Sequence, residues 1–125
     1  AITPQEIATT ATAPTAYHYV SHMYRQLAEH TPEAAFAGLV PCSWLYHEIG
    51  LRLMQKSSPV PIYQQWIDTY TTDEMVEVVA KQRALLDQLG DTLSAVELEP
   101  LRQAFLISSI EEYNFWQMAM DFQTW

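Results

Sequence analysis

The signals that begin an α-helix recur along this sequence, and they limit the fold more than any other feature. Thr3 to Glu6 and Ser94 to Glu97 are capping boxes, in which a hydroxyl and a glutamate three residues later satisfy backbone amides at a helix start. Thr31-Pro32 and Thr72-Asp73 are further starts. Apolar residues at three- to four-residue spacing follow each one, and no segment alternates long enough to suggest a strand. The pattern predicts an all-α helical bundle.

The helices expected from these signals cover most of the chain. Pro41 lies inside the third helix and is expected to kink it, because proline lacks an amide hydrogen and crowds the preceding turn. In the fourth, Ile62, Trp66 and Tyr70 are expected to face inward, and Gly90 is expected to end the fifth. The predicted helices are a short one from Pro4 that ends before Pro14, then Thr15 to about Glu29, Pro32 to about Lys56, roughly residues 62–70, Asp73 to about Gly90, and one from near Ser94 onward.

Chain length and charge narrow the possible functions. A chain of 125 residues predicts one domain spanning 1–125. Fifteen acidic residues against six Lys and Arg give a formal charge of −9, which disfavours nucleic acid and anionic membranes as partners and favours a neutral or cationic substrate. No apolar run approaches the ~20 residues of a membrane span. The single cysteine and the absence of a leader-like segment lead us to expect a free thiol in the cytoplasm.

Cys42 and Glu112 are the candidate catalytic residues. Cysteine is a strong nucleophile at neutral pH, and Cys42 follows Pro41 directly, with Tyr46 four residues on and on the same helical face. A lone cysteine is also a common core residue, so a structural role stays open. Glu112 lies in an apolar, aromatic stretch where burial would suit it to proton transfer. Glu111 is expected to be solvated, and the alternative is that both glutamates are simply exposed.

The tyrosines and histidines allow other interpretations. Tyr19 and Tyr70 at helical spacing are more often core residues than ligands. His18 and His22 stand four apart and, with His47, suggest a metal site, which would make the protein a metal-dependent helical oxidase. The sequence contains no Glu-x-x-His or His-Glu-x-x-His, no nucleophile elbow and no glycine-rich phosphate loop. We therefore expect neither a metal ion nor another cofactor.

Three segments resemble the signatures of the TenA/thiaminase II family. They occur in the family's order and at similar separations, and residues 13–23 resemble the family's segment ahead of the cysteine helix, so the resemblance covers nearly the whole chain. The segments are PCSWLYHEIG at 41–50, PIYQQWI at 61–67 followed by Tyr70, and EEYNFWQMA at 111–119.

This resemblance implies a heme-oxygenase-like helical bundle that binds no heme and acts in thiamin salvage. The implied activity is hydrolysis of 4-amino-5-aminomethyl-2-methylpyrimidine, a product of thiamin breakdown, with cleavage of thiamin itself as a related activity. By resemblance, Cys42 matches the nucleophile and Glu112 the acid/base, whereas Tyr19, Tyr46 and Tyr70 match the tyrosines that line the substrate pocket. The family also implies a homo-oligomer, specifically a homotetramer.

The resemblance covers the C-terminal part of the family's length. It therefore implies a bundle incomplete at its N-terminus, without the helices that supply an aspartate to the pyrimidine amino group and a further aromatic residue near the cysteine. Uncovered apolar helix faces are one reason to expect assembly with another copy. The alternative to a hydrolase is a non-catalytic TenA-like helical module that binds a pyrimidine or a partner.

Overall fold

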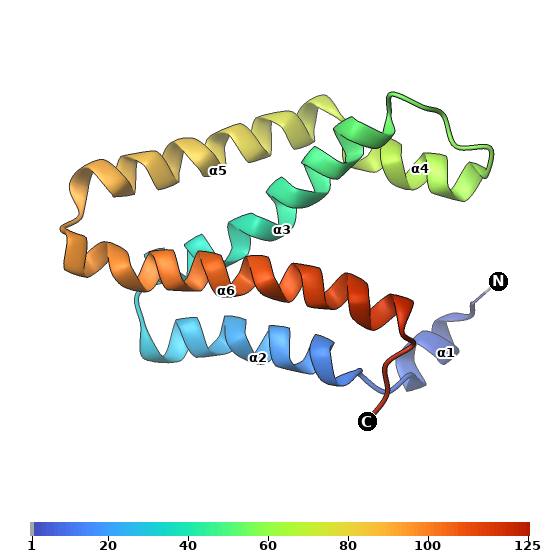
Figure 1. The fold of residues 1–125 in the computed structure, drawn as a ribbon, viewed down its shortest axis with the longest axis horizontal. Helices are drawn as coiled ribbons and strands as arrows, with labels where there is room; N and C mark the ends of the chain where they lie inside the picture. Colours follow the sequence, from blue (N-terminus) through green and yellow to red (C-terminus); the bar gives the residue numbers. More distant parts are fainter. Residues whose placement is uncertain (1) are drawn as a thin grey trace.

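The structure, a computed structural model, describes residues 2–125 and is all-α in that range, as the sequence predicts (Figure 1). Helix α3 crosses the molecule and packs most extensively against α6, and also against α2, α5 and α4. Helices α2 and α6 also pack against each other. The helices are α1 (Pro4–Thr9), α2 (Pro14–Glu29), α3 (Pro32–Leu53), α4 (Pro61–Thr69), α5 (Asp73–Thr92) and α6 (Ala95–Met120).

The predicted helix starts are confirmed. Both capping boxes form. The Thr3 and Ser94 hydroxyls accept hydrogen bonds from the amides three residues on, and the Glu6 and Glu97 carboxylates accept hydrogen bonds from the amides of Thr3 and Ser94. Thr31 and Thr72 each cap a helix through a side-chain hydroxyl. These bonds satisfy amide groups that have no partner inside the helix. Each start signal depends on residues within one turn, which is why it can be identified from the sequence.

Small residues allow α3 and α6 to approach closely. Ala34, Ala37 and Gly38 on α3 are buried, and a Cβ at Gly38 would lie 3.4 Å from Ser108 Oγ and 3.6 Å from Ala104 Cβ. Ala34 and Ala37 form the core cluster together with Leu101. Partly buried leucines from α5, α6 and the turn between them pack against this cluster: Leu86, Leu89, Leu93 and Leu98.

Three details of the predicted elements are wrong. Helix α5 runs through Gly90 to Thr92, because this glycine keeps a negative φ and Leu93 takes the C-cap position. Ile62 is 68% exposed, and Ile67 is instead the buried residue of α4. Helix α3 ends at Leu53, before the expected Lys56, and it contains Pro41 as predicted.

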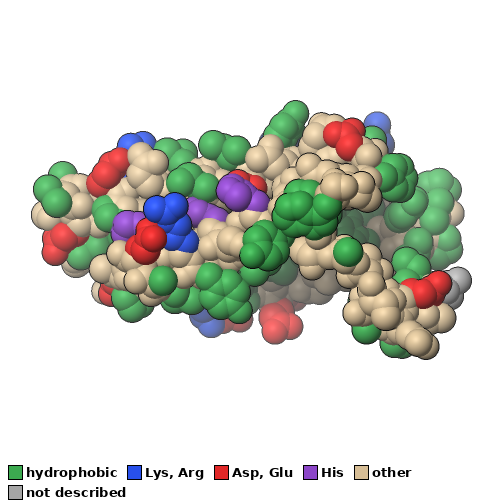
Figure 2. All heavy atoms as spheres, turned by 90° about the horizontal axis from the view of Figure 1, so that it is seen from below, with side chains coloured by type: hydrophobic (Ala, Val, Ile, Leu, Met, Phe, Trp, Pro, Cys, Tyr) green, Lys and Arg blue, Asp and Glu red, His purple; other side chains and the backbone are tan. Residues whose placement is uncertain are grey.

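Helix α2 packs a mainly polar face against α3 and α6. Its buried residues are Tyr19, His22 and Gln26, while the regularly spaced apolar residues that predict the helix are exposed. On the face seen in Figure 2, hydrophobic side chains accordingly stand among polar and charged ones. None of the helices in residues 2–125 is both long and apolar enough to cross a membrane. The exposed apolar residues of α2 include Tyr17, Val20, Tyr24 and Leu27.

Candidate functional site

Three helices bring Tyr19, Cys42 and Glu112 together. Glu112 on α6 is only 2% exposed, and the Tyr19 hydroxyl on α2 donates a hydrogen bond of 2.8 Å to its Oε1. Cys42 on α3 is a free cysteine and is exposed as a residue. Enough protein surrounds the thiol that desolvation raises its pKa to about 12, and Glu112 adds to this rise through its charge and through hydrogen bonding. The thiol and the carboxyl group therefore act on each other directly.

Tyr19 is held in its protonated form. Desolvation is the largest cause that raises its pKa, followed by the hydrogen bond to Glu112, the charge of Glu112 and the charge of Cys42. The Ser108 hydroxyl acts in the opposite direction. A phenol hydroxyl can donate to a carboxyl oxygen, and the Tyr19 hydroxyl lies at hydrogen-bonding distance from Glu112 Oε1.

Glu111 is buried, which corrects the expectation that it is solvated. Its side chain is 7% exposed, and its Oε1 lies 2.8 Å from His18 Nδ1 on α2. The partner is distant in the sequence and is supplied by the packing of α2 on α6. Burial of a carboxyl group costs several kcal/mol unless it is paired, and His18 provides that pairing.

An aromatic cluster adjoins these residues, and we define it as Tyr46, Trp66, Tyr70 and Trp116. Tyr46 on α3 lies at ring-centroid distances of 5.2 Å from Tyr70 and 5.7 Å from Trp116, and Trp66 lies 4.9 Å from Tyr70. The pKa of Tyr46 is raised, mainly by desolvation and then by the charges of Glu112 and Cys42. The cluster and the acid–thiol pair therefore belong to one electrostatic environment. Flat rings in this arrangement can stack on a flat heterocycle.

Two contacts with α3 fix the position of Tyr70 at the end of α4. His47 Nδ1 lies 2.8 Å from the Tyr70 carbonyl oxygen, a hydrogen-bonding distance that makes the histidine nitrogen the donor. A Cβ at Gly50 would lie 3.1 Å from both Tyr70 Cβ and Thr71 Cγ2. The absence of a side chain at Gly50 thus allows α3 to lie close to Tyr70 and Thr71, and a larger residue there would push them away.

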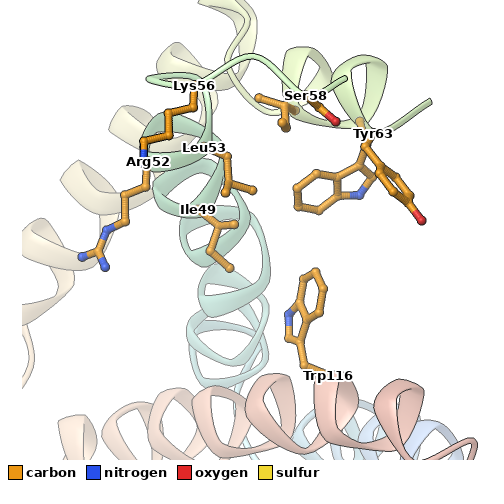
Figure 3. Close-up of a pocket in the computed structure, with 9 residues that line it drawn as sticks. Ile49, Arg52, Leu53, Lys56, Ser58, Tyr63 and Trp116 are labelled. Carbon is orange, nitrogen blue, oxygen red and sulfur yellow. The ribbon is translucent and has the colours of Figure 1, made fainter. Parts of the chain in front are cut away.

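A hollow of about 730 Å³ adjoins this cluster and is lined by residues of α3, α4 and α6 (Figure 3). Trp66 and Trp116 belong both to the cluster and to the lining of the hollow. Ile49, Arg52 and Leu53 line it from α3, with the Arg52 guanidinium extending away from Trp116 (Figure 3). The hollow and the acid–thiol pair therefore share an aromatic wall.

Three of the four histidines contact protein groups through Nδ1, and His22 Nε2 is buried without a hydrogen-bond partner in residues 2–125. His18 pairs with Glu111, His22 lies 3.3 Å from Gln26 through Nδ1, and His47 meets the Tyr70 carbonyl. Within residues 2–125, no group of three or more His, Cys, Asp or Glu side chains is placed to hold a metal ion.

The sequence argument missed three residues of this site. Trp66 lies four residues before Tyr70, Trp116 four residues after Glu112, and Ser108 four residues before it. The i,i+4 spacing from a candidate residue was a usable signal for all three, because such residues share a helix face. The tryptophans were assigned only to the apolar pattern of their helices.

Comparisons with known proteins agree with the resemblance seen in the sequence. Residues 1–122 match the model of the TENA/THI-4/PQQC family. The aminopyrimidine aminohydrolase of Bacillus subtilis (strain 168) is 39% identical over 113 residues, which are 90% of this chain and 48% of that protein. The enzyme of the same name from Staphylococcus aureus (strain USA300) is 35% identical over 117 residues, 90% of this chain and 50% of that protein. The chain thus spans about half the length of the curated relatives it matches.

One solved structure supports the fold. A TenA homologue protein from P. horikoshii OT3 superposes with a TM-score of 0.83 and 24% sequence identity, over 94% of this chain and 55% of that one. This likeness confirms the all-α, heme-oxygenase-like bundle expected from the sequence.

Proposed function

The chain belongs to the TENA/THI-4/PQQC family, and from this premise we propose that it takes part in the hydrolysis of an aminopyrimidine, with Cys42 as nucleophile and Glu112 as acid/base. The substrate we favour is 4-amino-5-aminomethyl-2-methylpyrimidine, with thiamin as a related substrate. The observation that carries the proposal is the buried Glu112, which accepts a hydrogen bond from Tyr19 and whose charge helps to raise the pKa of the Cys42 thiol.

The first step uses the carboxylate as a base. The pKa of Cys42 is raised to about 12, so the thiol is almost entirely protonated near neutral pH and must lose its proton as it attacks. Glu112 takes this proton while the sulfur adds to an electron-poor carbon of the pyrimidine ring. The added electron pair is delocalised onto a ring nitrogen, and Glu112 keeps the thiol proton for the next step.

In the second step Glu112 acts as an acid. Its proton goes to the exocyclic amine, the carbon–nitrogen bond breaks and ammonia leaves from the methylene carbon. Water then adds to the same carbon and gives a proton to Glu112. As the ring expels the sulfur, Glu112 returns this proton to the leaving thiolate. The net reaction replaces an amino group by a hydroxyl and restores both side chains.

The aromatic cluster supports a flat substrate. Tyr46 and Tyr70 present tilted rings 5.2 Å apart, and Tyr46 lies in the electrostatic field of Glu112 and Cys42. We propose that these rings, together with Tyr19, bind the pyrimidine beside the thiol. The formal charge of −9 also suits a neutral or cationic substrate better than an anionic one.

Incubation of the chain with the aminomethylpyrimidine tests the proposal. We expect equimolar ammonia and the hydroxymethyl product, and we expect Cys42→Ser to abolish both. Ser43→Ala is a matched control on the neighbouring residue, whose hydroxyl bonds to Val40 and Gln82. It should keep the wild-type rate.

The alternative, a non-catalytic module of the same fold that binds a pyrimidine or a protein partner, gives a different result. A folded sample that binds the pyrimidine in calorimetry without releasing ammonia would favour this module and overturn the hydrolase. Assembly into a homo-oligomer and a single domain over residues 1–125 remain part of the proposal. Sedimentation analysis and limited proteolysis test these two points.

A further inference from the structure

Ser108 is a buried polar residue whose hydroxyl lacks a hydrogen bond of regular geometry. It is 0% exposed, and its Oγ has no partner within residues 2–125. The next residue behaves differently, because the Ser109 hydroxyl donates to the Phe105 carbonyl at 2.8 Å. A serine inside a helix ordinarily takes this bond to the preceding turn. A buried hydroxyl without a partner costs roughly 1–3 kcal/mol, so the exception calls for an explanation.

The surroundings of Ser108 connect it to the candidate catalytic residues. Ser108 precedes Glu112 by one helical turn and lies on the same buried face of α6. From α3, the missing Cβ of Gly38 would lie 3.4 Å from Ser108 Oγ. From α2, the Tyr19 phenol lies near enough that the Ser108 hydroxyl counteracts the rise in its pKa. The hydroxyl therefore lies one helical turn from the carboxyl group to which this phenol donates.

We propose that Ser108 is a positioning residue that gives the Tyr19 hydroxyl a second hydrogen-bond partner when Glu112 is protonated. The inference rests on the proposed function, in which Glu112 alternates between carboxylate and carboxylic acid. While Glu112 is a carboxylate, Tyr19 donates to it, as observed. Once Glu112 has taken the thiol proton, it becomes a donor itself.

When protonated Glu112 donates to the Tyr19 oxygen, the hydrogen of the Tyr19 hydroxyl needs another acceptor. Glu112 donates to the Tyr19 oxygen, and the phenol hydrogen turns to Ser108 Oγ, which is free of other partners. No covalent bond changes in this reorientation. Ser108 thus stabilises the protonated state of the carboxyl group without contacting the substrate.

Ser108→Ala tests the inference, with Ser109→Ala as the matched control. One net hydrogen bond corresponds to a factor of about 2 to 12, so we expect kcat for Ser108→Ala to fall several-fold with KM nearly unchanged. The fall should be larger on the limb of the pH–rate profile where Glu112 must be protonated. Because the variant removes an unpartnered buried hydroxyl, its melting temperature should equal or exceed that of the wild type. Ser109→Ala should keep the wild-type kcat.

A second measurement needs no turnover. The rate of Cys42 alkylation by iodoacetamide is followed against pH in the wild type and both variants. Without Ser108 the protonated state of Glu112 is less stable, so the carboxylate charge persists to lower pH and the alkylation profile of Ser108→Ala should move to higher pH. The profile of Ser109→Ala should superimpose on the wild type.

The outcomes separate the two proposals. A Ser108→Ala variant with wild-type kcat and an unshifted alkylation profile overturns the positioning role, whatever its stability, and leaves the hydrolase intact. A wild-type chain that alkylates as expected but releases no ammonia overturns the hydrolase, and the alkylation comparison still decides whether Ser108 acts on the Tyr19–Glu112 pair.

Discussion

The two halves of α6 bury different chemistry on one continuous face. The first half buries Leu101 and Ala104, which pack on the small residues of α3. The second half buries Ser108, Glu111 and Glu112. Helix α6 packs against α3 and α2, and partly buried leucines of α5 pack against the cluster of the apolar half. The apolar half stabilises the fold, whereas the polar half holds groups that must be paired and therefore positions them.

The difference between the two halves of α6 separates residues that stabilise the fold from residues that need correctly placed partners. Burial of apolar side chains is favourable by roughly 25 cal/mol per Å² and needs no particular orientation. Burial of a carboxyl group is costly unless partners are placed correctly, as Tyr19 is for Glu112 and His18 for Glu111. Substitutions in the two halves should accordingly change different measurements.

The largest expected effect is the loss of turnover in Glu112→Gln. Removal of the proton-transferring group should lower kcat by about 10²–10⁴-fold, measured by ammonia release. Glu111→Gln is the matched control, since it changes the adjacent buried carboxyl group, and its loss should be far smaller. Equal losses in both variants would show that the polar half acts as one electrostatic unit rather than through Glu112.

Leu101→Ala should give the largest loss of stability. This residue is 6% exposed, and its truncation should lower the free energy of unfolding by about 2–5 kcal/mol, read from urea denaturation. Ile110 on the same helix is 58% exposed, so Ile110→Ala should change the free energy of unfolding by less than about 1 kcal/mol. If Leu101→Ala also moves the pH–rate profile, the two halves are not separable.

Glu112→Gln should also make Cys42 more reactive in the absence of substrate. The carboxylate raises the pKa of the thiol, so removing its charge lowers that pKa and increases the thiolate fraction at a given pH. Each unit by which the pKa falls increases the alkylation rate at pH 8 about tenfold. An unchanged rate in Glu112→Gln would mean that desolvation alone keeps the thiol protonated.

The smallest expected effect is a change in the free energy of unfolding when the cap at the start of α6 is removed. Ser94→Ala removes the capping hydroxyl of α6 and should lower the free energy of unfolding by about 1 kcal/mol. Thr3→Ala removes the same kind of cap from α1, which buries none of its residues, and should leave the global transition unchanged. A comparable loss in Thr3→Ala would show that α1 is part of the cooperative unit.

The sequence predicted what depends on nearby residues. The capping hydroxyls of Thr3, Thr31, Thr72 and Ser94 act within one turn, so all four helix starts are confirmed. Gly90 was misread because a glycine ends a helix only when the backbone takes a positive φ there, and the sequence does not specify this.

Contacts between distant residues limited the prediction of the site. The burial of Glu111 follows from His18, which lies far away in the chain, and local polarity suggested the opposite. Cys42, Glu112, Tyr19, Tyr46 and Tyr70 were named from motifs, and their roles in catalysis and binding stay predictions. That Tyr19 and Glu112 form a buried hydrogen bond is a fact of packing that no spacing rule contains.

The attachment of Tyr70 has a consequence for how such a protein can diversify. The thiol and the carboxyl group lie on the two helices with the most extensive mutual contact, whereas Tyr70 is delivered by a nine-residue helix anchored through His47 and the gap at Gly50. Mutations in α4 can therefore change the aromatic surface around Tyr70, where we propose that the pyrimidine binds, while Cys42 and Glu112 keep their relative position. Under the proposed function, changes in α4 can alter substrate preference without moving the helices that carry Cys42 and Glu112.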